Sequence, residues 1–307
     1  MQIYQHWQGL APEARGAAVA MGNFDGVHLG HRAVIDLARK QGPLGIVTFE
    51  PHPRQYFAAA APAFRLMNAE ARSNRLAKLG VTRLFELPFD AALATLTPAE
   101  FVDGVLDEGL GVAHVVVGAD FRFGRGRAGA AGDLVGLARE RGIEVTVAEL
   151  ISASGREISS TAIRQALSDG IPRAAAAMLG HWHRIEGEVI HGEKRGRALG
   201  YPTANMGLTG LHPPRFGVYA TRVDVLTGPQ AGSYRGASSL GIHPMFGENL
   251  PNLETFLLDF TGDLYGQHLS VALVDYLRPE LKFDGLPGLL TQIAVDVDRA
   301  RKILAVL

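Results

Sequence analysis

Up to about residue 180, the chain alternates short apolar runs with stretches in which apolar positions recur at helical spacing. The apolar runs lie at 17–22, 44–50, 81–87, 113–118 and 143–150. This alternation is typical of βαβ units, in which helices cover a parallel sheet. We therefore expect an α/β N-terminal domain built on a parallel sheet.

Local signals place several helix boundaries. A first helix is expected from about Leu29. Segment 97–100, Thr-Pro-Ala-Glu, predicts a second helix start because it combines an N-cap hydroxyl, a proline in the first turn and a glutamate three residues on. A further helix is expected to begin at the serines of ISSTAIRQAL and to end at Gly170. Pro172 then begins an alanine-rich stretch that leads to Gly180.

Beyond His181 the pattern changes to short alternating runs broken by glycine and proline. These runs lie at 185–192, 216–226, 234–242, 253–260 and 268–277. They predict an antiparallel barrel or sandwich. Apolar residues at helical spacing from about Leu286 to Leu307 predict a closing helix. The domain boundary is expected at 180–184, which gives domains 1–182 and 183–307.

Charge and composition narrow the choice of partners. The 30 Lys and Arg residues and 31 Asp and Glu residues leave a formal net charge of −1, so no overall basic field favours nucleic acid or an anionic membrane. The lack of cysteine excludes disulfides, thiolate nucleophiles and cysteine-ligated zinc. The start of the chain lacks a basic segment followed by an apolar run, and no stretch of about 18 apolar residues follows. We expect a cytoplasmic protein whose partners are small molecules.

The first candidate site is the segment GNFDGVHLGH at 22–31, which follows the first buried run. Its glycines allow close approach of the backbone, and the free N–H groups of a helix start attract an anion. His28 and His31 lie three residues apart, so both imidazoles can face one phosphate. A metal pair and structural histidines beside a tight turn are the alternatives. The metal is less favoured because no carboxylate or third histidine follows at ligand spacing on that helix.

The segment resembles the signature G-x-F-D-x-x-H-x-G-H of nucleotidyltransferases related to class I aminoacyl-tRNA synthetases. A second part of that pattern, I-S-S-T-x-x-R, stands at 158–164; alone it would be an N-cap cluster with a solvent arginine. The resemblance implies a Rossmann-like nucleotidyltransferase domain with His28, His31 and Arg164 as its catalytic groups. The ATP-binding residues that it implies are Gly22, Asn23, Phe24, Asp25, Ser159, Ser160 and Thr161.

Two further segments are similar to the flavin-binding parts of prokaryotic-type FAD synthetases. They are VTFEPHPRQYF at 47–57 and VGADFRFGRGRAG at 117–129. Taken alone, they would be a proline-rich strand exit and a basic, glycine-rich surface loop. Aromatic side chains can pack against a planar ring system, and arginines can bind a phosphate. The flavin-binding residues that the resemblance implies are Phe49, Pro51, His52, Arg54, Asp120, Phe121, Phe123 and Arg127.

The second candidate site is GEKRGRALGYPTANM at 192–206. A glycine-spaced basic loop can fold over phosphates. Thr203 and Asn205, two apart on an extended segment, can share one face and coordinate Mg²⁺ together with phosphate oxygens. The segment resembles the riboflavin kinase signature G-x-x-x-G-R-x-L-G-x-P-T-A-N. The ATP-binding residues implied are Gly192, Lys194, Gly196, Arg197 and Pro202, with Thr203 and Asn205 as metal ligands.

Glu254 matches the glutamate that is the candidate general base of the riboflavin kinase family, where it would deprotonate the ribityl hydroxyl. A carboxylate on a strand can also simply face solvent. The chain departs from the family at His243 and Met245, where arginine and threonine are frequent, and at Phe256, where histidine is frequent.

The resemblance covers nearly the whole chain and implies a bifunctional riboflavin kinase/FAD synthetase. Its substrates and products would be riboflavin, FMN, FAD and ATP, with Mg²⁺ accompanying ATP and no tightly bound organic cofactor. We expect no nucleic-acid or membrane partner, and the sequence does not report the oligomeric state. One alternative is a FAD synthetase whose flavin-binding C-terminal domain is catalytically silent. Another is a flavin-sensing or storage protein without turnover, which the retention of both triphosphate motifs makes less favoured.

Overall fold

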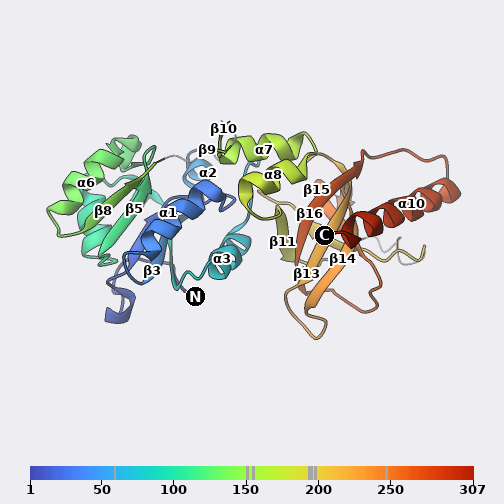
Figure 1. Ribbon diagram of the computed structural model, residues 1–307, viewed down its shortest axis with the longest axis horizontal. Coiled ribbons are helices and arrows are strands. Elements are labelled where there is room, and N and C mark those ends of the chain that lie inside the picture. The colour runs from blue at the N-terminus through green and yellow to red at the C-terminus, as the bar shows by residue number, and fades with distance from the viewer. Residues whose placement is uncertain (59, 150–151, 154–155, 193–195, 197–198, 246–247) are drawn as a thin grey trace. The chain divides into compact units, whose positions relative to one another are not determined.

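The computed structural model describes residues 1–58, 60–149, 152–153, 156–192, 196, 199–245 and 248–307 (Figure 1). The chain forms two compact units. The first unit contains residues 1–61 and 72–158, and the second unit contains residues 62–71 and 159–307. The short segment 62–71 therefore belongs with the C-terminal half of the chain, although it lies within the N-terminal half of the sequence.

The first unit is built on a parallel sheet of six strands in the order β1-β4-β3-β2-β5-β8 (Figure 1). The strands are β1 (Gln2–Tyr4), β2 (Ala18–Met21), β3 (Leu44–Glu50), β4 (Arg83–Pro88), β5 (His114–Gly118) and β8 (Glu144–Ala148). Strand β2 pairs with β3 on one side and with β5 on the other, so the strand order reverses there. Open α/β sheets bind their ligands at the carboxyl ends of the strands beside such a reversal.

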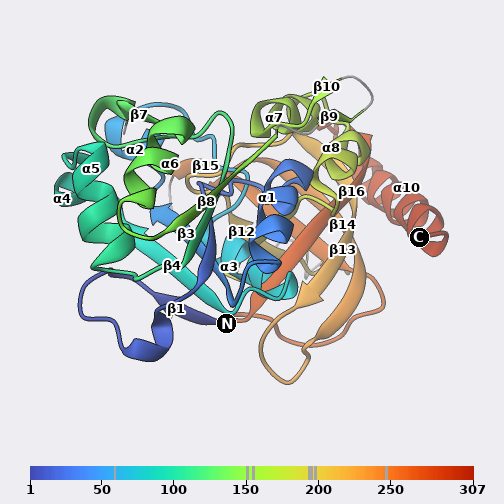
Figure 2. The same ribbon diagram turned by 60° about the vertical axis from the view of Figure 1, so that its left-hand side comes forward.

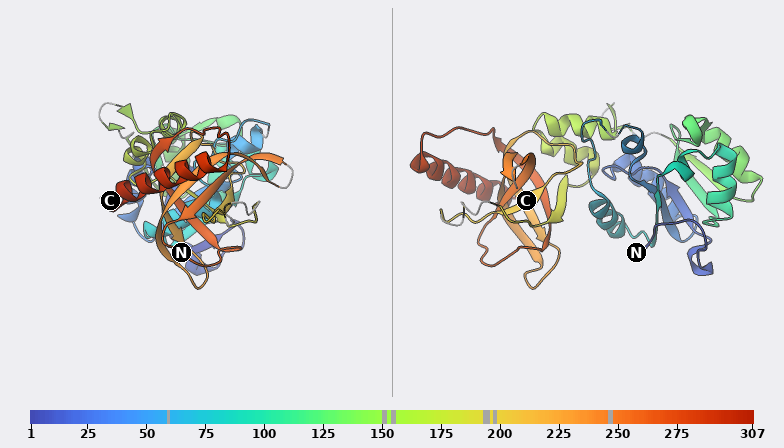
Figure 3. Two further views of the ribbon diagram at one scale, coloured as in Figure 1. Left: turned by 90° about the vertical axis from the view of Figure 1, so that its right-hand side faces the viewer. Right: turned by 180° about the vertical axis from the view of Figure 1, so that it is seen from behind.

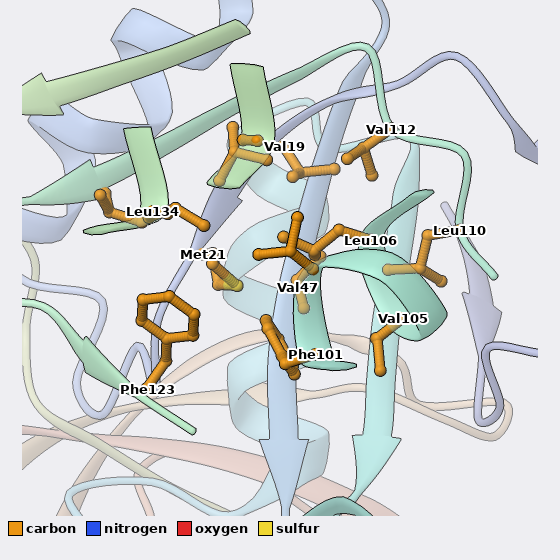
Figure 4. Close-up of a cluster of buried hydrophobic side chains, with 14 of the residues drawn as sticks. Val19, Met21, Val47, Phe101, Val105, Leu106, Leu110, Val112, Phe123 and Leu134 are labelled. Atoms are coloured by element: carbon orange, nitrogen blue, oxygen red, sulfur yellow. The ribbon is translucent and has the colours of Figure 1, made fainter. Parts of the chain in front are cut away.

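Helices cover both faces of this sheet (Figure 2). Successive strand residues point to opposite faces. Met21 pairs with Val47, so Val19, two residues before Met21, lies on the same face as Val47. On this face the two valines pack in a buried cluster with side chains of the π-helix η2 (Phe101–Asp107) and of α6 (Ala131–Arg139), as Figure 4 shows. Helix α1 (Leu29–Arg39) contacts β2, β3 and β5 and buries Ile35 and Ala38.

The remaining elements of the first unit are short, apart from α3. They are η1 (Pro12–Ala14), α2 (Pro53–Phe57), α3 (Ala69–Lys78), α4 (Ala91–Ala94), α5 (Pro98–Glu100), β6 (Arg122–Phe123), η3 (Arg125–Arg127), β7 (Gly129–Ala130), β9 (Ser152–Ala153) and β10 (Arg156–Glu157). Helix α3 begins in the second unit and ends in the first. The predicted capping box is confirmed, because the Thr97 hydroxyl accepts from the Glu100 N–H and the Glu100 carboxylate accepts from the Thr97 N–H.

The second unit contains an antiparallel sheet of six strands in the order β11-β16-β13-β14-β15-β12. The strands are β11 (Arg184–Glu188), β12 (Ala204–Gly207), β13 (Gly217–Val225), β14 (Gly232–Met245), β15 (Glu248–Leu257) and β16 (His268–Arg278). An isolated antiparallel bridge between Ile190 and Asn205 brings the two edges of the sheet together, and the Ile190 N–H donates to the Asn205 carbonyl at 2.9 Å. Of the two predicted architectures, the barrel is therefore the correct one.

The second unit also contains the helices α7 (Ser160–Ser168), α8 (Pro172–Leu179) and α10 (Leu286–Ala305). Helix α10 lies across the outside of the barrel (Figure 3), where Ala300 and Leu304 pack against side chains of β13, β14 and β16. The predicted helix boundaries at Leu29, Gly170, Pro172 and Gly180, and the closing helix, are confirmed. None of the described helices combines the length and the apolar character needed to cross a membrane.

A buried histidine makes the stability of the second unit sensitive to acid. The His183 side chain is 3% exposed. Burial, together with the nearby His181 and His212, lowers the pKa of His183 from 6.5 to about 3. Below about pH 6.5 the unfolded chain takes up a proton that the folded chain does not. The free energy of unfolding therefore falls by about 1.4 kcal/mol for each pH unit below that value, until about pH 3.

The substitution His183→Asn removes this titration. Between pH 7.5 and pH 5.5, wild-type protein should lose about 1.4 kcal/mol more of its unfolding free energy than the variant does. Urea unfolding of both proteins at the two pH values measures the difference. Equal losses would show that His183 does not titrate as its burial requires.

Candidate active sites

The loop that follows β2 is tightly held and locally strained. The Gly22 N–H donates to the Val47 carbonyl of β3 at 3.1 Å. Phe24 and Val27 adopt positive φ angles of 50° and 43°, which are unfavourable for residues with these side chains. Phe24 is 1% exposed and Asp25 is 5% exposed. Such strain persists only where surrounding contacts fix the backbone, and it is common at ligand sites.

The two predicted histidines lie together at the start of α1. His28 caps the helix, because its Nδ1 accepts the His31 backbone N–H at 3.2 Å. The two imidazole rings are stacked, with centroids 3.6 Å apart and planes 14° apart. Gly30 leaves room for this arrangement, since a Cβ at that position would lie 3.1 Å from the His28 ring. Both rings therefore lie on one side of the helix N-terminus, where backbone N–H groups favour an anion.

Electrostatics leave His31 uncharged at neutral pH. Burial lowers the pKa of His31 well below its ordinary value, and the neighbouring His28 lowers it further. The buried His31 Nδ1 has no hydrogen-bond partner among the described residues. A bound anion would raise the pKa of this imidazole and would offer it an acceptor. The position therefore has the character of a phosphate site.

The second part of the predicted triphosphate site lies at the start of α7. Ser159 caps this helix, and its hydroxyl accepts the Ala162 N–H at 3.3 Å. The Arg164 guanidinium donates to the Phe64 carbonyl at 3.3 Å and to the Thr161 hydroxyl at 3.4 Å. These residues belong to the second unit, whereas the histidine pair belongs to the first. Their joint action on one triphosphate stays a prediction.

The first predicted flavin segment follows the carboxyl end of β3. Phe49 is buried, and its ring contacts Phe89 and Phe101 with centroids 5.9 Å and 6.5 Å away. His52 caps α2, because its Nδ1 accepts the Arg54 N–H at 3.0 Å and its own N–H donates to the Gln55 side chain at 3.2 Å. This histidine thus has a structural role in the segment. Pro51 and the Arg54 side chain are exposed beside it.

The second predicted flavin segment follows the carboxyl end of β5. Phe123 is buried and stacks on Phe121, with ring planes 16° apart. Its ring also lies 5.8 Å from that of Phe101, so Phe101 touches the aromatic residues of both predicted segments. Asp120 and Arg127 lie exposed on the same loop. The structure therefore brings the two segments together through a shared aromatic core.

Sequence reasoning missed an exposed aromatic group beside these segments. The Tyr56, Phe57 and Phe89 rings contact one another edge to face, with centroids 5.1 to 5.7 Å apart. Phe57 is 68% exposed and Tyr56 is 39% exposed. Consecutive aromatic residues in a short polar helix were the available signal. Phe89 could not be found in this way, because it reaches the group from the end of β4.

The second site lies at the seam where the barrel edges meet. Gly192 packs against the Asn205 side chain: a Cβ at position 192 would lie 2.7 Å from Asn205 Nδ2. Gly196 packs against the Tyr201 carbonyl in the same way. Asn205 Nδ2 donates to the Thr203 carbonyl at 3.3 Å, and Pro202 is exposed. Lys194 and Arg197 lie outside the described residues.

Glu254 lies on β15, the strand that pairs with the strand of Asn205. In the antiparallel pairing of β12 with β15, Glu254 is directly opposite Asn205. Directly opposite residues project their side chains to the same face of a sheet. Leu253 and Leu257 belong to the buried cluster of the barrel, so Glu254 and Asn205 lie together on the opposite face of the sheet. The oxygens of this pair and of the Thr203 hydroxyl are the ligand type that Mg²⁺ prefers.

The three departures from the kinase pattern have different outcomes. His243 and Met245 lie at the end of β14, and their side chains fall outside the described part of the structure. Phe256 packs edge to face against Tyr201, with ring centroids 5.2 Å apart. Phe256 therefore supports the segment that leads to Thr203. Among the described residues, no group of three or more His, Asp or Glu side chains could hold a metal ion.

Comparison with known proteins assigns a family to each half of the chain. The family model described as FAD synthetase matches residues 10–162, and the one described as riboflavin kinase matches residues 179–304. A bifunctional riboflavin kinase/FMN adenylyltransferase from Pseudomonas fluorescens is 39% identical, over 99% of this chain and 98% of its own. Proteins of the same name from Escherichia coli strain K12 and Bacillus subtilis strain 168 are 38% and 35% identical. They cover 97% and 95% of this chain, and 95% and 93% of their own lengths.

A solved structure also matches the full length. It is named as a macrolide-efflux protein from Streptococcus pneumoniae, is 30% identical, and superposes with a TM-score of 0.81 over 98% of both chains. Both family models fit, and relatives more than 30% identical cover almost all of the sequence. This chain therefore belongs to the family of bifunctional riboflavin kinases/FMN adenylyltransferases.

Proposed function

We propose that this protein phosphorylates riboflavin with ATP to give FMN, and adenylylates FMN with a second ATP to give FAD and pyrophosphate. The observation that carries the proposal is the presence of one phosphate-type site in each unit. The first is the histidine pair at the start of α1, and the second is the glycine loop beside Asn205 and Glu254. Each group lies within the residues that one of the two family models matches.

In the adenylylation step, a phosphate oxygen of FMN attacks the α-phosphorus of ATP and the bond to pyrophosphate breaks. No covalent enzyme intermediate is needed, so the protein contributes alignment and charge stabilisation. His28, His31 and the N-terminus of α1 would bind the phosphates that develop charge. Ser159, Thr161 and Arg164 would donate further hydrogen bonds to the triphosphate.

In the kinase step, the terminal ribityl hydroxyl of riboflavin attacks the γ-phosphorus of ATP, the bond from this phosphorus to the β–γ bridging oxygen breaks, and ADP leaves. Glu254 would accept the hydroxyl proton, and its place directly opposite Asn205 puts it beside the proposed metal ligands. Thr203 and Asn205 would hold Mg²⁺, with the remaining ligands coming from phosphate oxygens and water. The metal supplies charge neutralisation at the phosphates. Gly192 and Gly196 would allow the backbone to approach the nucleotide closely.

The flavin of the adenylylation step would bind next to the aromatic core shared by the two predicted segments. Tyr56, Phe57 and Phe89 expose ring faces and edges there, which suit a planar heterocycle. Arg54 is exposed on the same short helix as Tyr56 and Phe57, and Arg127 is exposed on the loop that follows Phe123. Both would pair with the flavin phosphate. A cytoplasmic location, in which both substrates are available, remains part of the proposal and is testable by cell fractionation.

The two active sites should be separable by single substitutions in the full-length protein. His31→Ala should reduce FAD formation from FMN by at least about a hundredfold, because a group that stabilises the transition state is lost. Glu254→Gln should reduce FMN formation from riboflavin by about 10²-fold or more, because the amide cannot accept the proton. Chromatography of riboflavin, FMN, FAD, ADP and pyrophosphate measures both steps in each variant. Loss of both activities in either folded variant would contradict the two-site assignment, and wild type that forms FAD but no FMN would support a silent kinase domain.

A smaller change tests the glycine loop. Gly192→Ala places a methyl group 2.7 Å from Asn205 Nδ2, so the Asn205 side chain must move. We expect FMN formation to fall about tenfold while FAD formation from added FMN stays unchanged. Gly187→Ala is the matched control, since a Cβ there meets nothing within 4 Å. Equal kinase rates in the two variants would mean that Asn205 has no part in the reaction.

We also propose that residues 1–182 carry adenylylation and residues 183–307 carry the kinase. A fragment of residues 183–307 should form FMN, but it should unfold at lower urea than a fragment of residues 159–307. The longer fragment keeps the ion pair of Arg173 with Asp275 at 3.0 Å and the hydrogen bond from the Arg215 N–H to the Leu167 carbonyl at 2.9 Å. If only the longer fragment forms FMN, the boundary lies at the division between the compact units.

A further inference from the structure

Arg72 is an arginine of the first unit to which neither sequence motif assigns a role. It lies on α3, its side chain is 1% exposed, and it is among the largest fully buried side chains of the protein. Its Nη2 donates to Glu50 Oε2 at 2.8 Å and to Glu86 Oε2 at 2.7 Å. The buried charge is thus compensated by two carboxylates, one on the last residue of β3 and one within β4.

The other terminal nitrogen of Arg72 contacts the backbone of two loops. Nη1 lies 3.5 Å from the Asn23 carbonyl and 3.5 Å from the Phe49 carbonyl. The Asn23 carbonyl also accepts from the Thr48 hydroxyl at 3.3 Å. One guanidinium therefore spans the loop after β2 and the end of β3, and it is fixed in place by its carboxylate partners.

These two backbone positions adjoin the segments that we propose to bind the two substrates of adenylyl transfer. Asn23 directly precedes the strained Phe24 in the phosphate loop. Phe49 directly precedes Glu50 and the segment that ends at the exposed Tyr56 and Phe57. A loop with positive φ angles at non-glycine residues needs external contacts to hold its shape. A planar guanidinium with five donors can hold several acceptors at fixed relative positions.

We propose that Arg72 is a positioning residue for adenylyl transfer, which sets the phosphate loop and the flavin segment at a fixed separation. The inference rests on the proposed function of the first unit. An in-line displacement needs the FMN phosphate and the α-phosphorus of ATP to be aligned, and small displacements of either reactant slow such a step strongly. Arg72 touches neither substrate in this scheme and acts through the backbone at Asn23 and Phe49.

The test compares three variants of the full-length protein. Arg72→Met removes both backbone contacts, and Arg72→Met combined with Glu86→Leu does so without leaving the Glu86 carboxylate buried and unpaired. Glu86→Leu alone keeps Arg72 and its contacts to Glu50, Asn23 and Phe49. Arg15→Met is the matched control, because Arg15 also holds backbone carbonyls of the first unit, at Asp107, Glu108 and Gly109, which belong to neither proposed substrate segment.

Steady-state adenylylation of FMN is measured at a temperature at which circular dichroism shows every variant to be folded, with riboflavin phosphorylation as an internal control. We expect both Arg72 variants to lose about tenfold to a hundredfold in kcat. Arg15→Met should keep kcat within about twofold, even where its melting temperature falls, and kinase rates should not change. Glu86→Leu should lose less kcat than either Arg72 variant, because Arg72 keeps its Glu50 partner. Arg72→Lys, which restores a cation to the site, should recover part of the loss.

A folded double variant with wild-type kcat overturns the inference. A loss of kcat in Arg15→Met equal to that of the double variant also overturns it, because the effect would then follow stability alone. If Arg72→Met does not fold, the double variant decides the question. Wild-type protein that forms no FAD from FMN and ATP contradicts the proposed function instead, so the two failures are distinguishable.

Discussion

Parallel pairing is the constraint on which the first unit depends. Because β2, β3, β4 and β5 run in the same direction, their carboxyl ends meet at one edge of the sheet. The phosphate loop, both predicted flavin segments and Phe89 each follow one of these four strands directly. Residues far apart in the sequence thereby become neighbours, because Phe49 and Phe123 both contact the Phe101 ring. The antiparallel barrel also brings distant residues together. The bridge between Ile190 and Asn205 places Gly192 beside β12, and β12 pairs with the strand that carries Glu254.

Much of this architecture could be predicted from the sequence because it follows from local rules. The alternation of apolar runs and helical stretches predicts the parallel sheet, and Thr97, Gly170, Pro172 and Gly180 mark helix ends through capping chemistry. The choice between a barrel and a sandwich could not be made in the same way. It depends on one bridge between two sheet edges, at Ile190, and a bridge of that kind leaves no periodic signal.

The candidate sites were predictable as motifs but not as networks. His28 and His31 could be placed on one side of α1 from their spacing, whereas the stacking of their rings depends on the space left at Gly30. His52 matched a flavin motif and is observed to cap α2. Arg72 has no motif at all, because its partners come from β3 and β4 and from a loop nearly 50 residues earlier. Only tertiary structure identifies a residue of that kind.

Segment 62–71 makes the second unit discontinuous in the sequence. Leu66 packs with Ile163 and Leu167, Asn68 donates to the Glu186 carbonyl, and Glu70 pairs with His268. Segment 62–71 therefore packs in the second unit, although the chain returns to the first unit after it. No single cut therefore divides the protein into two pieces that each retain every contact of their unit. Recombination between relatives at a single crossover near residue 159 would join residues 159–307 of one protein to segment 62–71 of the other. These two parts of the second unit would then have to be compatible with each other. Selection on the kinase half thus reaches ten residues that are inherited with the synthetase half.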